Sequence, residues 1–229
     1  MQTDVQPNIR PGTIPEKGLW ITRQDGSPLC LYSPHPKQVL FHESDAPNLL
    51  AIGSRGSGKS LMLRNDAHMR ALSIPGCTLI LIRKTMKQLE QSHLLYINEE
   101  MKYLGGYYHG TRHCAYYPNG SKLFFSYVGH ADDALNLLSA EFLAAYYDEL
   151  SVIPWDYFQK LNASVRVSGA FKDMGLKAVT RSATNPLGPS MVEINRYFID
   201  KAATYEEEDD ENYFPSEWDS IRIDMEDNP

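Results

Sequence analysis

The stretch Gly53-Ser54-Arg55-Gly56-Ser57-Gly58-Lys59-Ser60 decides how this chain folds. It fits the pattern G-x-x-x-x-G-K-[S/T] of the phosphate-binding loop, whose glycines let successive backbone N–H groups face one anion. The apolar residues 48–52 predict a short buried strand before the loop, and residues 61–73 predict a helix after it. The N-terminus of that helix adds a partial positive charge at the same point. The sequence therefore predicts a binding site for ATP or GTP.

Side chains of this loop have expected roles. Lys59 would reach the β- and γ-phosphates, and the Ser60 hydroxyl would bind Mg²⁺. The alternative is a glycine-rich turn with an incidental lysine, but the strand before it and the helix after it favour nucleotide binding. The residues expected to hold the nucleotide here are Gly53, Ser54, Arg55, Gly56, Ser57, Gly58, Lys59, Ser60 and Leu61.

Composition places the chain among ordinary globular proteins. Its 229 residues are 42% hydrophobic and 22% charged, which suits one domain with appendages. We find no apolar run long enough to span a membrane and no secretion signal at the N-terminus. The three cysteines are widely spaced, which predicts neither a zinc site nor a disulfide framework and favours a reducing cytoplasm.

Charge is distributed unevenly along the chain. Residues 204–229 hold eleven acidic residues and one basic residue, although the net charge of the whole chain is only −7. Residues 1–203 are therefore mildly basic, which leaves binding to a polyanion open. We expect an extended, poorly packed arm over residues 1–30, a nucleotide-binding domain over residues 31–203 and a solvated acidic segment over residues 204–229.

Hydrophobic patterns predict strands that alternate with helices. Such alternation is typical of an α/β fold with a mostly parallel sheet that is covered on both faces. An Asn-Gly turn at residues 119–120 predicts a β-hairpin inserted into this pattern. Further strands are expected at residues 78–82, 142–147 and 176–183, and helices at residues 34–43, 86–104, 132–139, 154–166 and 189–198.

A second chemical signal is the apolar strand that ends in Asp148-Glu149. Ligands of open α/β sheets bind at the carboxyl ends of the strands, where these two acids are expected. Asp148 would hold Mg²⁺, through water, and Glu149 would polarise the attacking water as general base. The alternative is an ordinary acidic turn at a strand end, which is less favoured after a good phosphate loop.

A third signal is Ser182-Ala183-Thr184-Asn185-Pro186, at the end of another predicted strand. The hydroxyl of Thr184 or the amide of Asn185, at a strand tip beside the γ-phosphate, can sense hydrolysis by gaining or losing a hydrogen bond. Asn-Pro is also a common turn starter, so these residues alone leave both interpretations open.

Together these motifs resemble the ATPase domain of the large terminase subunit, the motor that packages DNA in tailed bacteriophages. The resemblance extends over residues 32–229 and also includes Arg83-Lys84-Thr85 and Asn119-Gly120-Ser121. It implies a P-loop ATPase of the RecA-like, additional-strand, catalytic-glutamate type. The strand that carries Thr184 would then lie between the strands that precede Lys59 and Glu149.

The resemblance also implies contacts with the base and partners for the whole assembly. Pro34-His35-Pro36-Lys37-Gln38 is similar to the adenine-recognition segment of the family, in which Gln38 would read the adenine edge and Tyr32 would pack on the ring. The working unit would be a ring of five subunits on the portal protein of an empty capsid. Double-stranded DNA and the small terminase subunit would be partners, in the cytoplasm of the infected bacterium.

Two features depart from the family pattern. Many members carry a basic residue about ten positions before the catalytic glutamate, whereas residues 136–140 here contain none. Arg55 is therefore the first candidate for an arginine finger, in cis or toward a neighbouring subunit, with Arg166 as a weaker one and a surface role for Arg55 as the alternative. The family also continues into a nuclease domain, so we expect this chain to be truncated and its last acids to be a linker rather than a nuclease site.

Other functions of the same core remain as alternatives. An ATP-dependent helicase or remodeller shares these motifs but generally carries a second RecA-like domain. A non-translocating assembly switch would not need a dedicated base such as Glu149. A small-molecule kinase is least favoured because no lid sequence is evident.

Overall fold

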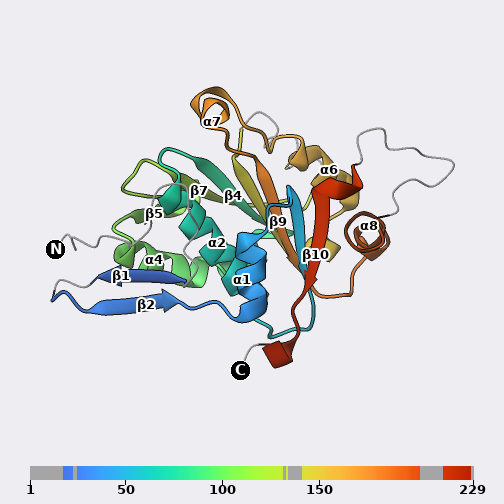
Figure 1. Cartoon of the computed structure of the whole chain (residues 1–229), viewed down its shortest axis with the longest axis horizontal. Coiled ribbons are helices and arrows are strands. Elements are labelled where there is room, and N and C mark those ends of the chain that lie inside the picture. Colours follow the sequence, from blue (N-terminus) through green and yellow to red (C-terminus); the bar gives the residue numbers. More distant parts are fainter. Residues whose placement is uncertain (1–17, 23–24, 131–132, 134–140, 202–213, 228–229) are drawn as a thin grey trace.

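A single large sheet organises the molecule. The computed structural model describes residues 18–22, 25–130, 133, 141–201 and 214–227 (Figure 1). Eight strands form this sheet in the order β10-β3-β9-β8-β4-β7-β6-β5. The bounds are β10 Trp218–Arg222, β3 Asn48–Ile52, β9 Val179–Thr184, β8 Ala144–Asp148, β4 Thr78–Arg83, β7 Lys122–Tyr127, β6 Cys114–Tyr116 and β5 Tyr107–His109. The strands from β10 to β7 are parallel, and β6 and β5 add an antiparallel edge.

Helices cover both faces of this sheet. Alternate residues of one strand enter two separate cores: Leu79 and Leu81 pack in the core of α2, and Ile80 and Ile82 pack in the core of α6. This two-sided burial explains why the parallel strands are continuous apolar runs. The helices are α1 Pro36–Glu43, α2 Lys59–Ser73, α3 Met86–Glu90, α4 Leu94–Tyr103, α6 Trp155–Asn162, α7 Gly169–Asp173 and α8 Met191–Ile194. Within the described ranges, no helix is both long and apolar enough to cross a membrane.

The strand order matches the predicted α/β, P-loop architecture. β9 lies between β3 and β8, with Ile52 opposite Thr184 and Asp148 opposite Ala183. The phosphate loop, the acidic pair and the third motif therefore leave the sheet at the same edge. The predicted hairpin is confirmed as β6 and β7, which pair antiparallel across the turn at Gly120.

One long helix predicted over residues 86–104 is instead two, α3 and α4. Between them the Ser92 hydroxyl donates to the carbonyl of Gln88 at 2.6 Å, and Arg83 Nη1 donates to the same carbonyl at 3.1 Å. Side chains that take up backbone carbonyls compete with the helix, so the helix ends here. The helix predicted over residues 189–198 is present but changes type, since α8 passes directly into a π-helical turn at Asn195–Ile199. The helix predicted over residues 132–139 lies almost wholly outside the described residues.

The predicted N-terminal arm needs correction where the structure describes it. β1 Leu19–Thr22 and β2 Pro28–Tyr32 pair as an antiparallel hairpin. Leu19 and Ile21 are buried in the same core as α2, because their alternation puts both side chains on one face of the strand. The prolines of residues 7–15 suggested an arm but precede the described residues, whereas Leu19-x-Ile21 was the signal for a strand.

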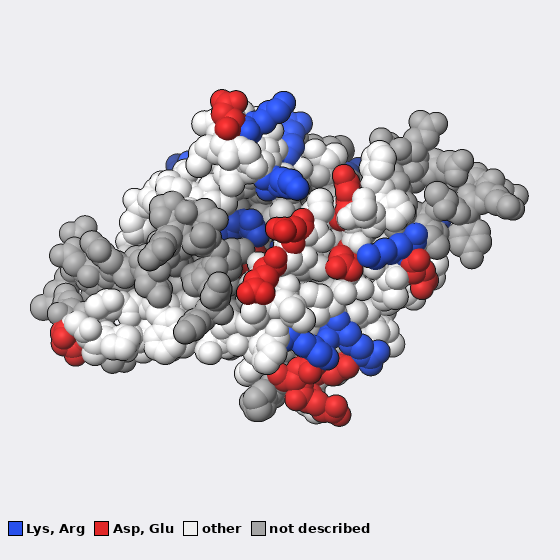
Figure 2. Space-filling view, in the orientation of Figure 1, with Lys and Arg blue, Asp and Glu red and all other residues white. Residues whose placement is uncertain are grey.

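The acidic C-terminal segment also needs correction. Residues 218–222 form β10, which pairs in parallel with β3 at the edge of the sheet, and Ile223 is fully buried. Two acids on this segment are partly buried and paired, Asp224 with Arg222 at 2.7 Å and Asp227 with Lys37 at 2.9 Å. Figure 2 shows acidic and basic side chains together at this lower end of the molecule. The acidic run at residues 206–211 lies outside the described residues.

Under α2, the carboxylate of Asp66 is buried but fully partnered. It lies 2.8 Å from His42 Nδ1, accepts a hydrogen bond from the Tyr146 hydroxyl at 2.8 Å and lies 3.9 Å from Arg70. Burial alone would raise the pKa of Asp66, but the hydrogen bond from His42 and the charge of Arg70 outweigh it and lower the pKa to about 2. The folded state therefore stabilises the charged carboxylate.

This geometry predicts loss of stability in acid. An unfolded aspartate takes up its proton near pH ~4, whereas Asp66 in the folded chain does so at about 2. The free energy of unfolding should therefore fall as the pH drops through this window. Asp66→Asn should cost about 2–4 kcal/mol at pH 7 and reduce the acid dependence, measured by urea unfolding at pH 7, 4 and 3. The exposed Asp156→Asn is the control, with an expected change of under about 0.5 kcal/mol; equal losses for both variants would contradict the prediction.

Candidate nucleotide-binding site

The phosphate loop joins the end of β3 to the start of α2. Gly56 and Gly58 have φ angles of 85° and 77°, which residues other than glycine rarely adopt. Gly53 is required for a different reason, because a Cβ there would lie 1.8 Å from the carbonyl oxygen of Ile223. α2 begins at Lys59, so its first N–H groups and its dipole point into the loop.

Lys59 is buried and folded back onto its own loop. Its Nζ donates to the carbonyls of Gly53 at 3.1 Å and Ser54 at 2.6 Å and to the Ser57 hydroxyl at 2.9 Å. Burial lowers the pKa of Lys59, against the opposing charges of Asp148 and Asp224. The ammonium is thus held by neutral oxygens, which charged phosphate oxygens can displace with a gain in hydrogen-bond strength.

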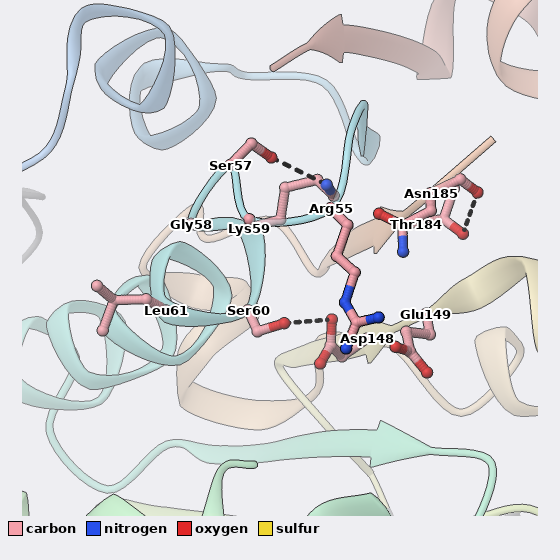
Figure 3. A pocket seen from close by; sticks show the side chains of 11 residues that line it. Arg55, Ser57, Gly58, Lys59, Ser60, Leu61, Asp148, Glu149, Thr184 and Asn185 are labelled. Carbon is pink, nitrogen blue, oxygen red and sulfur yellow. Dashed lines mark hydrogen bonds between the residues drawn. The ribbon is translucent and has the colours of Figure 1, made fainter. Parts of the chain in front are cut away.

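A cavity of about 460 Å³ lies over this loop. The three sequence motifs meet there, as the shared sheet edge requires (Figure 3). It is lined by Arg55, Gly56, Ser57, Gly58, Lys59, Ser60, Leu61, Asp148, Glu149, Thr184 and Asn185. Gly53 and Ser54, which were expected to hold nucleotide, lie at the base of the loop and are not part of this lining. In Figure 3 the Leu61 side chain points away from the polar groups.

Asp148 is the buried acid of the site. Its Oδ1 accepts a hydrogen bond from the Ser60 hydroxyl at 3.1 Å, while Oδ2 lies 3.0 Å from His93 Nε2 and 3.3 Å from Arg83 Nε. Burial would raise the pKa of Asp148, but the hydrogen bond with His93, followed by the charge of Arg83 and the hydrogen bond from Ser60, lowers it. The carboxylate is therefore charged. Together with Ser60 it forms a pair of adjacent oxygen donors, the kind that Mg²⁺ prefers, so these residues fit that ion.

Glu149 has an unusual backbone and an unexpected partner. Its φ of 58° lies in the left-handed region, which costs a residue with a side chain about 1–3 kcal/mol and has to be held by its surroundings. The side chain is 36% exposed, and Oε1 lies 2.7 Å from Arg83 Nη2. Arg83 thus contacts both acids. Sequence reasoning noted Arg83 without giving it a role in the site; its place at the end of β4, next to β8, was the available signal.

The family comparison decides the assignment. A model of the phage terminase large subunit family matches residues 48–220. The chain belongs to the phage terminase large subunit family. No curated protein sequence matches it.

Solved terminase structures share the fold of this chain. The large terminase of a thermophilic bacteriophage, here called the thermophilic-phage terminase, has a TM-score of 0.62 at 17% identity, over 85% of this chain and 46% of that protein. The same protein was solved with ADP (TM-score 0.61, 16% identity, 85% and 46% coverage). The large terminase ATPase domain of Thermus phage P74-26 has a TM-score of 0.55 at 18% identity, over 83% of this chain and 81% of that one. This terminase chain thus corresponds to about half the length of the thermophilic-phage terminase.

Two residues that were expected to contact adenine are not among those that line the cavity of this terminase chain. Gln38 and Tyr32 are both buried and outside the cavity lining. Gln38 Oε1 accepts from the backbone N–H of His35 at 3.0 Å and from the Tyr32 hydroxyl at 3.2 Å, and that hydroxyl lies 2.9 Å from His42 Nε2. Gln38 therefore caps α1 and Tyr32 packs in the core, and the expected adenine contact of both side chains stays a prediction.

The candidate arginines differ in position. Figure 3 shows the Arg55 side chain reaching from the loop toward Asp148 and Glu149, in keeping with a role inside the site. Arg166 instead forms an ion pair with Glu141 at 2.9 Å, is half-exposed and is not part of the cavity lining. Residues 136–140, where the family arginine was sought, lie outside the described residues.

We predict that the fork of Arg83 is needed, and not only its charge. Arg83→Lys keeps one charge but cannot contact both acids and the Gln88 carbonyl at once. It should lower kcat for ATP hydrolysis roughly tenfold and leave KM within about threefold, because the effect falls on the orientation of Asp148 and Glu149. Steady-state kinetics test this. Arg112→Lys, in the exposed η1 turn Gly110–Arg112, is the control; wild-type kcat in Arg83→Lys would remove Arg83 from the site.

Proposed function

We propose that this chain binds and hydrolyses Mg·ATP and that hydrolysis drives double-stranded viral DNA into a procapsid. The observation that carries the proposal is the meeting of Lys59, Asp148, Glu149 and Thr184 around one cavity in a member of the terminase family. The ADP and ATP-γ-S complexes of the thermophilic-phage terminase support a nucleotide as its ligand.

The residues divide the work of hydrolysis by their positions. Lys59 exchanges the carbonyls of its loop for the β- and γ-phosphates, and the N–H groups at the start of α2 add further donors. Ser60 and Asp148 would hold Mg²⁺, which when bound would neutralise charge on the phosphate oxygens. The guanidinium of Arg55 stabilises the charge that develops on the phosphate being transferred.

Glu149 acts as the general base on the attacking water. Its Oε1 is paired with Arg83 in this structure, so the carboxylate has to turn from Arg83 toward the cavity before it accepts the proton of the water. Its exposed fraction of 36% leaves room for that rotation. The water oxygen then attacks the terminal phosphorus, and the bond between that phosphorus and the bridging oxygen of ADP breaks. Lys59 remains in contact with the β-phosphate of the departing ADP.

Translocation involves partners outside this chain. We infer that five copies of this chain form a ring on the portal protein, and that the small terminase subunit is a further partner of this ring. Its substrate is double-stranded DNA in the cytoplasm of the infected bacterium. Family membership supports these partners.

Glu149→Gln should separate binding from chemistry. The amide keeps the shape of the side chain but cannot accept the proton, so kcat should fall by about 10²–10⁴-fold while ATP still binds. Lys59→Ala is the contrasting variant and should lose binding of ATP by at least about tenfold, because its phosphate contacts are charge-assisted. Titration with a fluorescent ATP analogue and a phosphate-release assay measure the two effects. Loss of ATP binding in Glu149→Gln would contradict the assigned role.

A packaging assay tests the biological half of the proposal. Portal-bearing procapsids, linear duplex DNA and ATP should together yield DNA protected from added nuclease, and Glu149→Gln should yield none. Protection without ATP would indicate simple binding, and unwinding of a forked duplex without protection would favour a helicase. Either result contradicts packaging while leaving ATP hydrolysis intact.

A further inference from the structure

The turn that follows Glu149 is hydrogen-bonded to the strand that carries the third motif. The turn is η2, Leu150–Val152, and its central residue Ser151 is only 2% exposed. The Ser151 N–H donates to Thr184 Oγ1 at 3.1 Å, and the Thr184 hydroxyl donates to Ser151 Oγ at 2.7 Å. The Ser151 hydroxyl in turn donates to the carbonyl of Leu187 at 2.7 Å. Two side chains and two backbone groups therefore form one continuous chain of hydrogen bonds.

The protons in this chain are limited. Each hydroxyl has one proton to give, and that of Thr184 lies within reach of Ser151 Oγ at 2.7 Å and of the Asn185 carbonyl at 3.1 Å. Thr184 can therefore donate fully to Ser151 Oγ or to another acceptor, but not to both. Thr184 also lines the cavity, where a terminal phosphate would place charged oxygens close to it. Hydrogen bonds to charged acceptors are stronger. When a phosphate oxygen is within reach, the Thr184 hydroxyl therefore donates to that oxygen instead of to Ser151 Oγ. After the phosphate has left, the Thr184 hydroxyl again donates its hydrogen bond to Ser151 Oγ.

The loop beyond β9 is packed tightly on Ser151. The carbonyl of Ser151 accepts a hydrogen bond from the N–H of Ser190 at 3.1 Å. A Cβ at Gly188 would lie 2.4 Å from the same carbonyl oxygen, so only glycine fits there. Leu187, to which the Ser151 hydroxyl donates, is 79% exposed. The loop of residues 185–190 thus connects the inside of the site with the surface through Ser151.

Glu149 lies at the other end of the same turn. Its left-handed backbone is followed directly by η2, and the N–H of Val152 donates to the Glu149 carbonyl at 3.0 Å. A conformation that costs free energy persists only while neighbouring contacts hold it. The bonds from Ser151 to Thr184, Leu187 and Ser190 are among the contacts that hold this turn, beside the ion pair of Glu149 with Arg83 and the bond of the Ser190 hydroxyl to Ile153.

We propose that Ser151 is a positioning residue that competes with the terminal phosphate for the proton of Thr184, and thereby couples the Glu149 turn and the 185–190 loop to the state of the nucleotide. This inference rests on the proposed ATP hydrolysis. It adds a residue that none of the sequence motifs contains, because Ser151 follows the acidic pair and its partners come from the end of β9 and the loop after it, more than 30 residues later.

A double-mutant cycle tests the coupling. Ser151→Ala and Thr184→Val each remove one hydroxyl, and each should lower kcat about tenfold with KM within about threefold. The double variant should be no slower than the slower single variant, because both act on one bond. Additive losses, of about a hundredfold in the double variant, would overturn the proposal. Thr184→Ser keeps the hydroxyl, so in that background Ser151→Ala should still cost about tenfold.

Ser190→Ala is the matched control. It removes an equally buried hydroxyl from the same loop, whose bond of 2.7 Å goes to the carbonyl of Ile153 and not to Thr184. The control should lose thermal stability to a similar extent as Ser151→Ala but keep the kcat of the unmodified chain. Equal kcat losses in the two variants would show that Ser151 acts only through stability.

Hydrogen exchange on the unsubstituted chain provides a readout that does not depend on variants. Exchange of residues 185–190 should differ at least about threefold between the complex with ADP and that with a non-hydrolysable ATP analogue. Identical exchange in the two complexes would overturn the proposal even if Ser151→Ala fails to fold. Failure of the ATPase proposal is distinguishable, since the unsubstituted chain would then neither bind nor hydrolyse ATP.

Discussion

The centre of this molecule is arranged around the buried negative charge of Asp148. A carboxylate taken out of water costs several kcal/mol unless donors replace the water. Ser60 from α2 and His93 from the residues between α3 and α4 supply hydrogen bonds, and Arg83 from β4 adds a positive charge at 3.3 Å. The break in the predicted long helix thus has a consequence for the site, because it brings His93 to the carboxylate.

The donors of Asp148 are themselves partnered at greater depth. His93 Nδ1 lies 3.4 Å from Arg64 Nη1, and Arg64 donates to both carboxylate oxygens of Glu100, from Nε and from Nη2, each at 2.8 Å. His68 Nε2 lies 3.1 Å from the same carboxylate. The hydrogen bond and charge of His68, followed by those of Arg64, overcome burial and lower the pKa of Glu100 to about 2. The buried Asp148 is therefore connected, through His93 and Arg64, to a polar network between α2 and α4. This network holds the two helices in one arrangement.

Sequence reasoning succeeded where a pattern of neighbouring residues has only one physical explanation. The phosphate loop, the strand before Asp148 and the Asn-Gly hairpin are local, and their order along a parallel sheet follows from general rules. It failed where long-range pairing decides. Residues 218–222 contain too few apolar residues for their sequence to predict a strand. They form one because they pair with the edge of β3. The assignment of Gln38 to a base stays a prediction from the resemblance, and in this structure its oxygen caps α1.

The residues directly after β10 also fix the conformation of the first residues of the phosphate loop. The N–H of Ile223 donates to the carbonyl of Ile52 at 2.8 Å, and the carbonyl of Ile223 leaves no room for a side chain at Gly53. Directly after it, the N–H of Ser54 donates to Asp224 Oδ1 at 3.3 Å and the N–H of Met225 to the Ser54 hydroxyl at 2.7 Å. The first residues of the loop are thus held by a segment 170 positions away in sequence. Because Lys59 rests on the carbonyls of Gly53 and Ser54, any displacement of that segment moves the oxygens that release Lys59 to a phosphate.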